Sequence, residues 1–180
     1  MDSFIEEVIL TNEDIRNICE RLGQEITKDY EGKKPILIGM LKGAVPFMAE
    51  LMKHIKCDME TEYMSVSSYN GGTSSTGSLN IKKDLDVDIH GRDVIIVEDI
   101  IDTGLTMEKI VDLLLIRGAK SVEIACLLDK PSSRCHACKE AKYKGYTIEP
   151  KFVVGFGLDY DEIYRNLDYI GVLKKSVYEK

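Results

Sequence analysis

The sequence predicts an α/β fold with a mostly parallel central sheet flanked by helices. Three short apolar runs, residues 36–41, 93–100 and 121–129, are typical of strands that are buried on both faces. Segments with helical spacing separate these runs, and strands that alternate with helices form parallel sheets. The 180 residues contain no internal repeat and no linker, so a single domain is expected over residues 1–180.

The first part of the chain predicts a helix, a strand, a turn and a second helix. In residues 11–30 apolar side chains recur every three to four positions, and Thr11 is a suitable N-cap. Pro35 opens the first apolar run, which fits a buried strand. Helical spacing returns in residues 47–52, after a glycine-containing turn.

Residues 58–87 hold two weaker strand patterns with a loop between them. Residues 58–69 are rich in Thr, Tyr, Val and Ser, which favour strands. The stretch that follows, residues 69–78, places three glycines among small polar residues and predicts a long mobile loop. Residues 79–87 then return the chain as a strand to a turn at His90 and Gly91.

The central buried strand is expected at residues 93–100, which read DVIIVEDI. A helix follows over about 106–117, and Gly118 stands where a left-handed C-cap is expected. Residues 121–129 then predict the next strand of the sheet.

Beyond Lys130 the pattern is less regular. Residues 151–157 predict a further short strand, and residues 167–173 precede a charged tail. The spacing of Cys135 and Cys138 is one that zinc sites use, but structural zinc needs four ligands and no second cysteine pair is present. A plain loop with reduced thiols is therefore the preferred interpretation.

Charge and hydropathy exclude several classes of function. A net charge of -7 argues against general affinity for nucleic acid or anionic lipid. The first residues lack a basic region, and no run of about eighteen apolar residues is present, so a cytoplasmic protein is expected and a membrane protein is not. Cys19, Cys57 and Cys126 show no paired spacing, which suits reduced thiols.

The loop after Val97 is the expected place for a ligand, because open parallel sheets bind ligands beyond the carboxyl ends of their strands. Residues 102–106 lie between a strand and a helix N-terminus, where backbone N–H groups and hydroxyls can converge on a phosphate. From these residues alone a simple polar turn is about as probable. The adjacent pair Glu98 and Asp99 favours a site, because a polyhydroxyl ligand or a divalent cation would offset the desolvation of two carboxylates.

Residues 94–107, which read VIIVEDIIDTGLTM, closely resemble the phosphoribosyl pyrophosphate motif of the type I phosphoribosyltransferase family. The resemblance implies a fold with a small hood region and a flexible active-site loop beside the sheet. It also implies that Glu98 and Asp99 bind the ribose 2- and 3-hydroxyls. The 5-phosphate would be cradled by Asp102, Thr103, Gly104, Leu105 and Thr106.

Two further segments resemble the hypoxanthine/guanine branch of that family. GMLKGAVPF, from Gly39 to Phe47, resembles its pyrophosphate loop, which implies a pyrophosphate contact at Leu41, Lys42 and Gly43. Without the resemblance, Lys42 would pass as a solvated surface lysine. Ser68, Tyr69 and the glycine-rich run after them resemble the family's flexible loop, although composition alone would describe an ordinary surface loop.

The acceptor residues follow from the same resemblance. Lys130 resembles the lysine that donates a hydrogen bond to the 6-oxo group of a purine. Phe152 resembles the aromatic ring that stacks on the base, and Val153 the residue whose backbone reads the base edge. Taken alone, a buried Phe belongs more often to the core.

The family's magnesium and pyrophosphate contacts match residues near the end of the chain. Asp159, together with Glu98 and Asp99, is implied to hold Mg²⁺, and Arg165 is implied to contact pyrophosphate. Without the resemblance, Asp159 and Arg165 would be ordinary surface charges. The same resemblance implies assembly as a homodimer or homotetramer.

The implied reaction joins a 6-oxopurine to the 5-phosphoribosyl group of phosphoribosyl pyrophosphate. We hypothesise that Asp102, placed beside the purine, is the general acid/base for the N7 proton. One rival is a phosphoribosyltransferase for adenine, xanthine or a pyrimidine. A second rival, from another class, is a regulator that binds nucleotides or RNA without catalysis, but the acidic chain lacks the basic face such a regulator would show.

Overall fold

The computed structural model describes residues 2–68, 79–134 and 138–179. These residues form a six-stranded sheet in the order β4-β3-β2-β5-β6-β7, parallel except for the antiparallel pair β3 and β4. The predicted mostly parallel α/β fold is therefore confirmed. The strands of this main sheet are β2 (Ile36–Met40), β3 (Glu60–Ser68), β4 (Leu79–Lys83), β5 (Asp93–Ile101), β6 (Ser121–Asp129) and β7 (Tyr143–Thr147).

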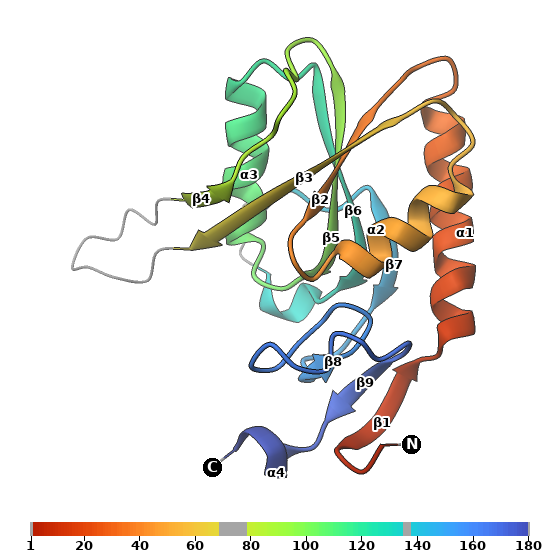
Figure 1. Ribbon diagram of the computed structural model, residues 1–180, viewed down its shortest axis with the longest axis vertical. Helices are drawn as coiled ribbons and strands as arrows, with labels where there is room; N and C mark the ends of the chain where they lie inside the picture. The colour runs from red at the N-terminus through yellow and green to blue at the C-terminus, as the bar shows by residue number, and fades with distance from the viewer. Residues whose placement is uncertain (1, 69–78, 135–137, 180) are drawn as a thin grey trace, which may run out of the picture.

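Helices cover both faces of the main sheet (Figure 1). On one face lie α1 (Asn12–Asp29), α2 (Val45–Leu51) and the 3-10 turn η1 (Met52–His54); on the other lies α3 (Leu105–Ile116). Thr11 caps α1 as predicted, because its hydroxyl accepts from the backbone N–H of Asp14 and the Asp14 carboxylate accepts from the N–H of Thr11. None of the helices in the described residues combines the length and apolar character that a membrane span requires.

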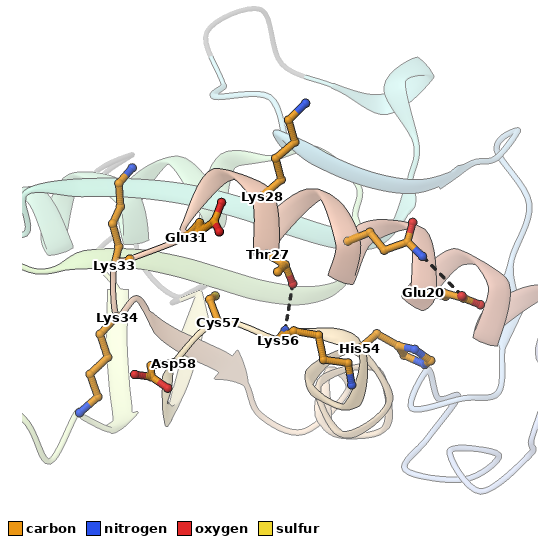
Figure 2. Close-up of a pocket in the computed structure, with 12 residues that line it drawn as sticks. Glu20, Thr27, Lys28, Glu31, Lys33, Lys34, His54, Lys56, Cys57 and Asp58 are labelled. Atoms are coloured by element: carbon orange, nitrogen blue, oxygen red, sulfur yellow. Dashed lines mark hydrogen bonds between the residues drawn. The ribbon is translucent and has the colours of Figure 1, made fainter.

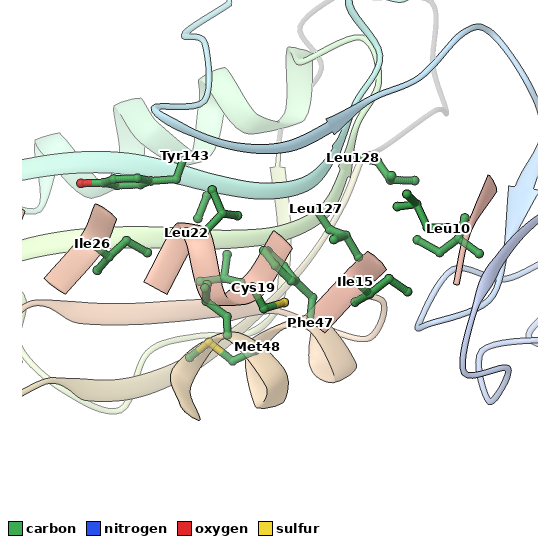
Figure 3. Packing of buried hydrophobic residues seen from close by; sticks show 14 of the residues in the cluster. Leu10, Ile15, Cys19, Leu22, Ile26, Phe47, Met48, Leu127, Leu128 and Tyr143 are labelled. Carbon is green, nitrogen blue, oxygen red and sulfur yellow. The ribbon is translucent and has the colours of Figure 1, made fainter. Parts of the chain in front are cut away.

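The core has two main parts, one on each face of the sheet. On the α1 side, Ile15, Cys19 and Leu22 pack with Phe47 and Met48 of α2 (Figure 3). On the α3 side, the apolar face of the helix packs against β2, β5 and β6 through Ile36, Ile38, Val94, Ile96, Met107, Ile110, Leu114 and Ile124. Successive side chains of β5 thus serve opposite faces, as expected of a strand with no wet face.

A small antiparallel sheet forms the hood that the resemblance implies. It joins β1 (Ile5–Leu10), β9 (Ile170–Leu173) and β8 (Val153–Val154) in the order β1-β9-β8, with the short helix α4 (Lys175–Tyr178) after it. In Figure 1 this sheet lies below the main sheet, and both ends of the chain are beside it. Leu10, Val153 and Ile170 of this small sheet belong to the core on the α1 side, so the hood packs against the main sheet and α1.

Several elements differ from the sequence predictions. The segment after Lys130 was expected to be irregular, but it contains the 3-10 turn η2 (Pro131–Ser133) and strand β7. The return strand stops at Lys83 instead of continuing to Val87, and residues 151–157 contribute only the two residues of β8. No strand was predicted at β1. β7 is an edge strand of Tyr, Lys, Gly, Tyr and Thr, so its sequence lacks the apolar run of a central strand.

Candidate active site

The predicted site lies at the carboxyl edge of β5 and β6. Ile101 and Asp129 are paired in register at the ends of these parallel strands, so the residues that follow them, Asp102 and Lys130, emerge side by side. The backbone N–H of Lys130 donates to the carbonyl of Ile101 at 3.0 Å. The Lys130 ammonium is 3.4 Å from a carboxylate oxygen of Asp102. A cation and a carboxylate from different segments thus meet at this edge.

The predicted phosphate cradle, residues 102–106, forms the turn from β5 into α3. Gly104 is the N-cap of α3 and has a left-handed backbone, φ 79°. A Cβ atom there would lie 2.8 Å from Cβ of Cys138 and 3.0 Å from Cδ of Arg134, so only glycine fits without displacement. The turn borders a cavity of about 160 Å³ lined by Glu98, Ile100, Ile101, Asp102, Thr103, Gly104, Thr106 and Met107. This is the geometry of a helix N-terminus open to an anion.

The acid pair Glu98 and Asp99 is partly buried near the end of β5. Loss of water on burial, reinforced by the negative charge of Asp99, raises the pKa of Glu98 well above its ordinary value. Burial also raises the pKa of Asp99, although hydrogen bonding to Glu98 and the positive charge of Arg165 oppose that rise. The desolvation inferred from the sequence is therefore present. A hydrogen-bond donor or a cation that contacts the carboxylate oxygens of Glu98 and Asp99 would offset this cost of desolvation.

The loop after β2 approaches the acid pair directly. A Cβ atom at Gly43 would lie 1.8 Å from Oδ2 of Asp99, so the close approach requires a glycine. The Leu41-Lys42 peptide bond in this loop is cis. The ammonium of Lys42 is 2.7 Å from a carboxylate oxygen of Glu162, and both side chains are exposed. Lys42 is thus held beside the segment that carries Arg165.

Asp159 and Arg165 form an ion pair at the same edge. One guanidinium nitrogen of Arg165, Nη2, lies 3.0 Å from a carboxylate oxygen of Asp159, and Nη1 donates to the carbonyl of Gly157 at 2.7 Å. The Nε of Arg165 is buried with no hydrogen-bond partner. The ammonium of Lys42 beside Glu162 lowers the pKa of that carboxyl. Glu162, which the sequence did not single out, therefore bridges Lys42 and Arg165.

Phe152 and Val153 lie in the hood. Val153 is buried in β8 and pairs with β9. Phe152 is 41% exposed, so the interpretation of this ring as core is wrong. Its ring stacks on Tyr178 with centroids 4.8 Å apart and meets the edge of Tyr160 at 5.7 Å. An aromatic side chain that remains accessible is free to contact a planar ligand.

The predicted flexible loop falls largely on residues that the structure does not describe. Ser68 is the last residue of β3 and pairs with Leu79 of β4. Tyr69 and the glycine-rich run lie outside the described residues.

Two residues beside the site, Asp129 at the end of β6 and Arg134 in the loop after it, are not among the site residues predicted from the sequence. Arg134 forms an ion pair with the buried carboxylate of Asp129. Neither residue could be singled out from the sequence, because a strand-end Asp and a loop Arg are common surface charges. Cys138 is disulfide-bonded, so the prediction of reduced thiols is wrong at this position, and Cys135 lies outside the described residues. The sulfur of Cys138 is 3.5 Å from the Thr103 carbonyl oxygen.

A wider groove lies away from this site, along α1 and the turn into β3 (Figure 2). Its volume is about 920 Å³, and both lysines and carboxylates line it. Lys34 pairs with Glu60, and the ammonium of Lys56 donates to the carbonyl of Lys53, so these cations are already engaged. Thr27 bridges the groove by accepting from the backbone N–H of Lys56. The groove lies at the amino ends of β2 and β3, and we therefore place the active site at the opposite edge.

The phosphate turn, the acid pair and the parallel sheet define the class: residues 7–161 match the family model of the phosphoribosyl transferase domain. The hypoxanthine-guanine phosphoribosyltransferase of Lactococcus lactis is 53% identical over 180 residues, covering 100% of this chain and 97% of the relative. The hypoxanthine-guanine phosphoribosyltransferase of Streptococcus pneumoniae is 53% identical over 178 residues, which cover 99% of this chain and 98% of the relative. The chain belongs to the hypoxanthine-guanine phosphoribosyltransferase family.

Solved structures agree with this assignment. A hypoxanthine phosphoribosyltransferase from Staphylococcus aureus superposes with a TM-score of 0.93 at 52% identity, covering 98% of this chain and 96% of that one. A Trypanosoma cruzi hypoxanthine phosphoribosyltransferase in complex with the product IMP superposes with a TM-score of 0.92 at 34% identity, covering 99% and 95%. The predicted family and fold are confirmed.

Proposed function

We propose that this enzyme transfers the 5-phosphoribosyl group from phosphoribosyl pyrophosphate to N9 of hypoxanthine or guanine, giving IMP or GMP and pyrophosphate. The observation that carries the proposal is the approach of Lys130 to Asp102 at 3.4 Å. It sets a donor suited to a 6-oxo group beside a carboxylate suited to the N7 proton. A 6-amino group is itself a donor and cannot accept from the lysine.

The donor substrate is proposed to lie along residues 98–106. Its 5-phosphate occupies the N-terminus of α3, where the turn 102–106 presents backbone N–H groups and the hydroxyls of Thr103 and Thr106. The 2- and 3-hydroxyls of the ribose bind Glu98 and Asp99, whose desolvation such contacts would relieve.

Cations on the other side of the ribose are proposed to receive the leaving pyrophosphate. Lys42 and Arg165 are drawn together through Glu162, and Nε of Arg165 has a buried N–H without a partner. As the bond between C1 and pyrophosphate breaks, negative charge grows on the leaving group, and fixed cations stabilise it there. The loop Leu41, Lys42 and Gly43 is proposed to contact the pyrophosphate as well, through the N–H groups of Lys42 and Gly43, because the N–H of Leu41 already donates to the carbonyl of Met64.

Asp102 is proposed to move the N7 proton while the new bond forms between N9 and C1. Its side chain is 52% exposed, so a bound purine can reach it. Phe152 is proposed to stack on the purine ring, and the backbone of Val153 to read its edge. These roles leave Lys130 to recognise the 6-oxo group.

Mg²⁺ is proposed as the cofactor. Among the described residues no group of three or more His, Cys, Asp or Glu side chains is arranged to hold a metal by itself. That pattern fits magnesium, which commonly binds one or two carboxylates together with substrate phosphates. The carboxylates proposed to contact the ion are Glu98 and Asp99 on one side of the substrate and Asp159, oriented by Arg165, on the other, with the substrate phosphates completing its ligands. When bound, the ion supplies positive charge to the pyrophosphate.

A steady-state assay tests the function. The enzyme is supplied with phosphoribosyl pyrophosphate, magnesium and, in turn, hypoxanthine, guanine, xanthine or adenine, and nucleotide formation is measured. Turnover of hypoxanthine or guanine far above adenine is expected. Activity with adenine alone would contradict the role of Lys130. A Lys130→Gln variant should lose the discrimination between the bases. Lys120→Gln, an exposed lysine that pairs with Asp93 at the start of β5, is the control for charge and should keep it.

Three further predictions from the sequence belong to the same proposal. We propose that residues 1–180 form one domain, supported by the core that Leu10 and Ile170 share with α1. A homo-oligomer is proposed because Leu115 and Ile116 on α3, 48% and 84% exposed, are large apolar side chains that an interface would cover. Light scattering coupled to gel filtration tests this assembly. The cytoplasmic location stays a prediction.

A further inference from the structure

Arg134 occupies an unusual position behind the active site. Its side chain is only 14% exposed, and its Nη2 donates to the carboxylate of Asp129. Among the described residues, Asp129 is the one charged side chain that is fully buried, with 4% exposure. The same Nη2 lies 3.5 Å from the carbonyl oxygen of Ile101. One guanidinium therefore contacts the ends of two neighbouring strands.

Those two contacts fall where the active-site side chains begin. Ile101 and Asp129 are register partners at the ends of β5 and β6. Each immediately precedes an active-site residue: Asp102 follows Ile101, and Lys130 follows Asp129. The distance between the Lys130 ammonium and the Asp102 carboxylate therefore depends on how the two strand ends are held relative to each other. A planar guanidinium is well suited to fix two acceptors at once.

Arg134 also supports the phosphate turn. Its Cδ lies 3.0 Å from the point where a Cβ atom at Gly104 would stand. Its Nε and Nη1 are buried and have no hydrogen-bond partner. A buried cation with unused donors is unfavourable on its own account. Placed next to a turn that receives a phosphate dianion, the same positive charge attracts the ligand.

We propose that Arg134 is a positioning residue, which sets the distance and orientation between Asp102 and Lys130. Through that geometry it controls the rate of proton transfer and the discrimination between 6-oxo and 6-amino purines. The inference rests on the proposed function, because it assigns Arg134 an effect on that reaction. It differs from a purely structural role, which would change the amount of folded enzyme without changing how the folded enzyme distinguishes its substrates.

The test compares Arg134→Gln and Arg134→Lys with a matched ion pair elsewhere. Arg117 contacts both carboxylate oxygens of Asp84, at 2.5 and 2.7 Å, away from the site, so Arg117→Gln is the control. For each variant, kcat and KM for both substrates, the pH profile of kcat, and the ratio of kcat/KM for hypoxanthine to that for adenine are measured. Wild type is assayed in parallel.

Arg134→Gln is expected to lower kcat by about 100-fold, the effect of a displacement near 1 Å at a reacting group. The hypoxanthine to adenine ratio should fall and the pH profile should shift. Arg134→Lys keeps the charge and should recover part of kcat. Arg117→Gln should leave the ratio and the pH profile as in wild type.

The proposal is overturned if folded Arg134→Gln keeps the wild-type ratio and pH profile, whatever its kcat. Without Arg134, the buried Asp129 keeps only the ammonium of Lys144, at 3.7 Å, as an ion-pair partner among the described residues. If Arg134→Gln does not fold for that reason, the double variant Asp129→Asn with Arg134→Gln removes both charges, and the same two readouts decide. A wild-type enzyme with no preference for hypoxanthine would instead overturn the proposed function, so the two failures are distinguishable.

Discussion

The two halves of the active site are built in different ways. The donor half, residues 98–106, is one uninterrupted stretch at the end of β5, whereas the acceptor half combines Lys130 at the end of β6 with Phe152 and Val153 of the hood. The donor half takes its shape mainly from the turn between β5 and α3, with Gly43 close to Asp99 and Arg134 close to Gly104. The acceptor half needs the hood to pack correctly onto the main sheet. Changes in the first should therefore act locally, and changes in the second through packing.

Asp102 belongs to both halves, so its substitution should have the largest effect. Asp102→Asn keeps the shape of the side chain and removes proton transfer, and kcat should fall by about 10²- to 10⁴-fold. The KM for the phosphoribosyl donor should stay close to wild type. Steady-state kinetics with both substrates measure this, with Asp112→Asn on the exposed side of α3 as control. Unchanged kcat would remove Asp102 from the mechanism.

Gly104 tests whether the donor half acts locally. In Gly104→Ala, the left-handed backbone conformation costs about 1–2 kcal/mol, and the methyl group meets Arg134 and Cys138. The KM for phosphoribosyl pyrophosphate should rise about tenfold or more, since ~1.4 kcal/mol corresponds to a factor of ten. Gly91→Ala has a similar φ of 71° with open space around it, and serves as control. An equal rise in the KM for the purine would contradict a local effect.

Tyr178 tests the acceptor half through packing, because it stacks on Phe152 from α4. Tyr178→Ala removes the ring that holds Phe152, and the KM for hypoxanthine should rise about 2- to 10-fold, matching ~0.5–1.5 kcal/mol for an aromatic pair. The donor KM should not change. Tyr178→Phe retains the ring and should behave like wild type. A fall in the purine KM would instead mean that Tyr178 occupies the place of the base.

The smallest effect is expected on stability, from the acid pair of the donor half. Because burial raises the pKa of Glu98, the folded state binds a proton more readily than the unfolded chain. The free energy of unfolding therefore falls as the pH rises above the ordinary value of 4.5 and on through the raised pKa. Glu98→Gln removes that loss and should raise Tm at neutral pH by about 2–4 °C for each ~1 kcal/mol recovered.

Thermal denaturation of wild type and Glu98→Gln at pH 5 and pH 8 measures this difference. The variant should show the weaker pH dependence, although Asp99 retains part of it because its pKa is raised as well. Identical pH dependence in the two proteins would show that Glu98 is not destabilising in the folded state. Asp58→Asn, an exposed change at the start of the turn into β3, is a suitable control.

The same contrast explains what could be predicted from the sequence. The bounds of β5 and α3, the elements that carry the donor half, were predicted to within one residue because apolar runs and helical spacing are local signals. β7 was missed because an edge strand rich in polar residues carries no such signal. Arg134 and Asp129 were missed because their importance comes from strand register and burial, which arise only in the folded chain.

The strand order of the hood also bears on how the enzyme is made. β9 lies between β1 and β8, so neither of those strands has a neighbour in the small sheet until Ile170–Leu173 has left the ribosome. During synthesis, all strands of the main sheet emerge earlier, and the donor half can take shape while the hood is still unpaired. We therefore expect the purine contacts proposed for Phe152 and Val153 to form only after β9 has paired between two strands that were made before it.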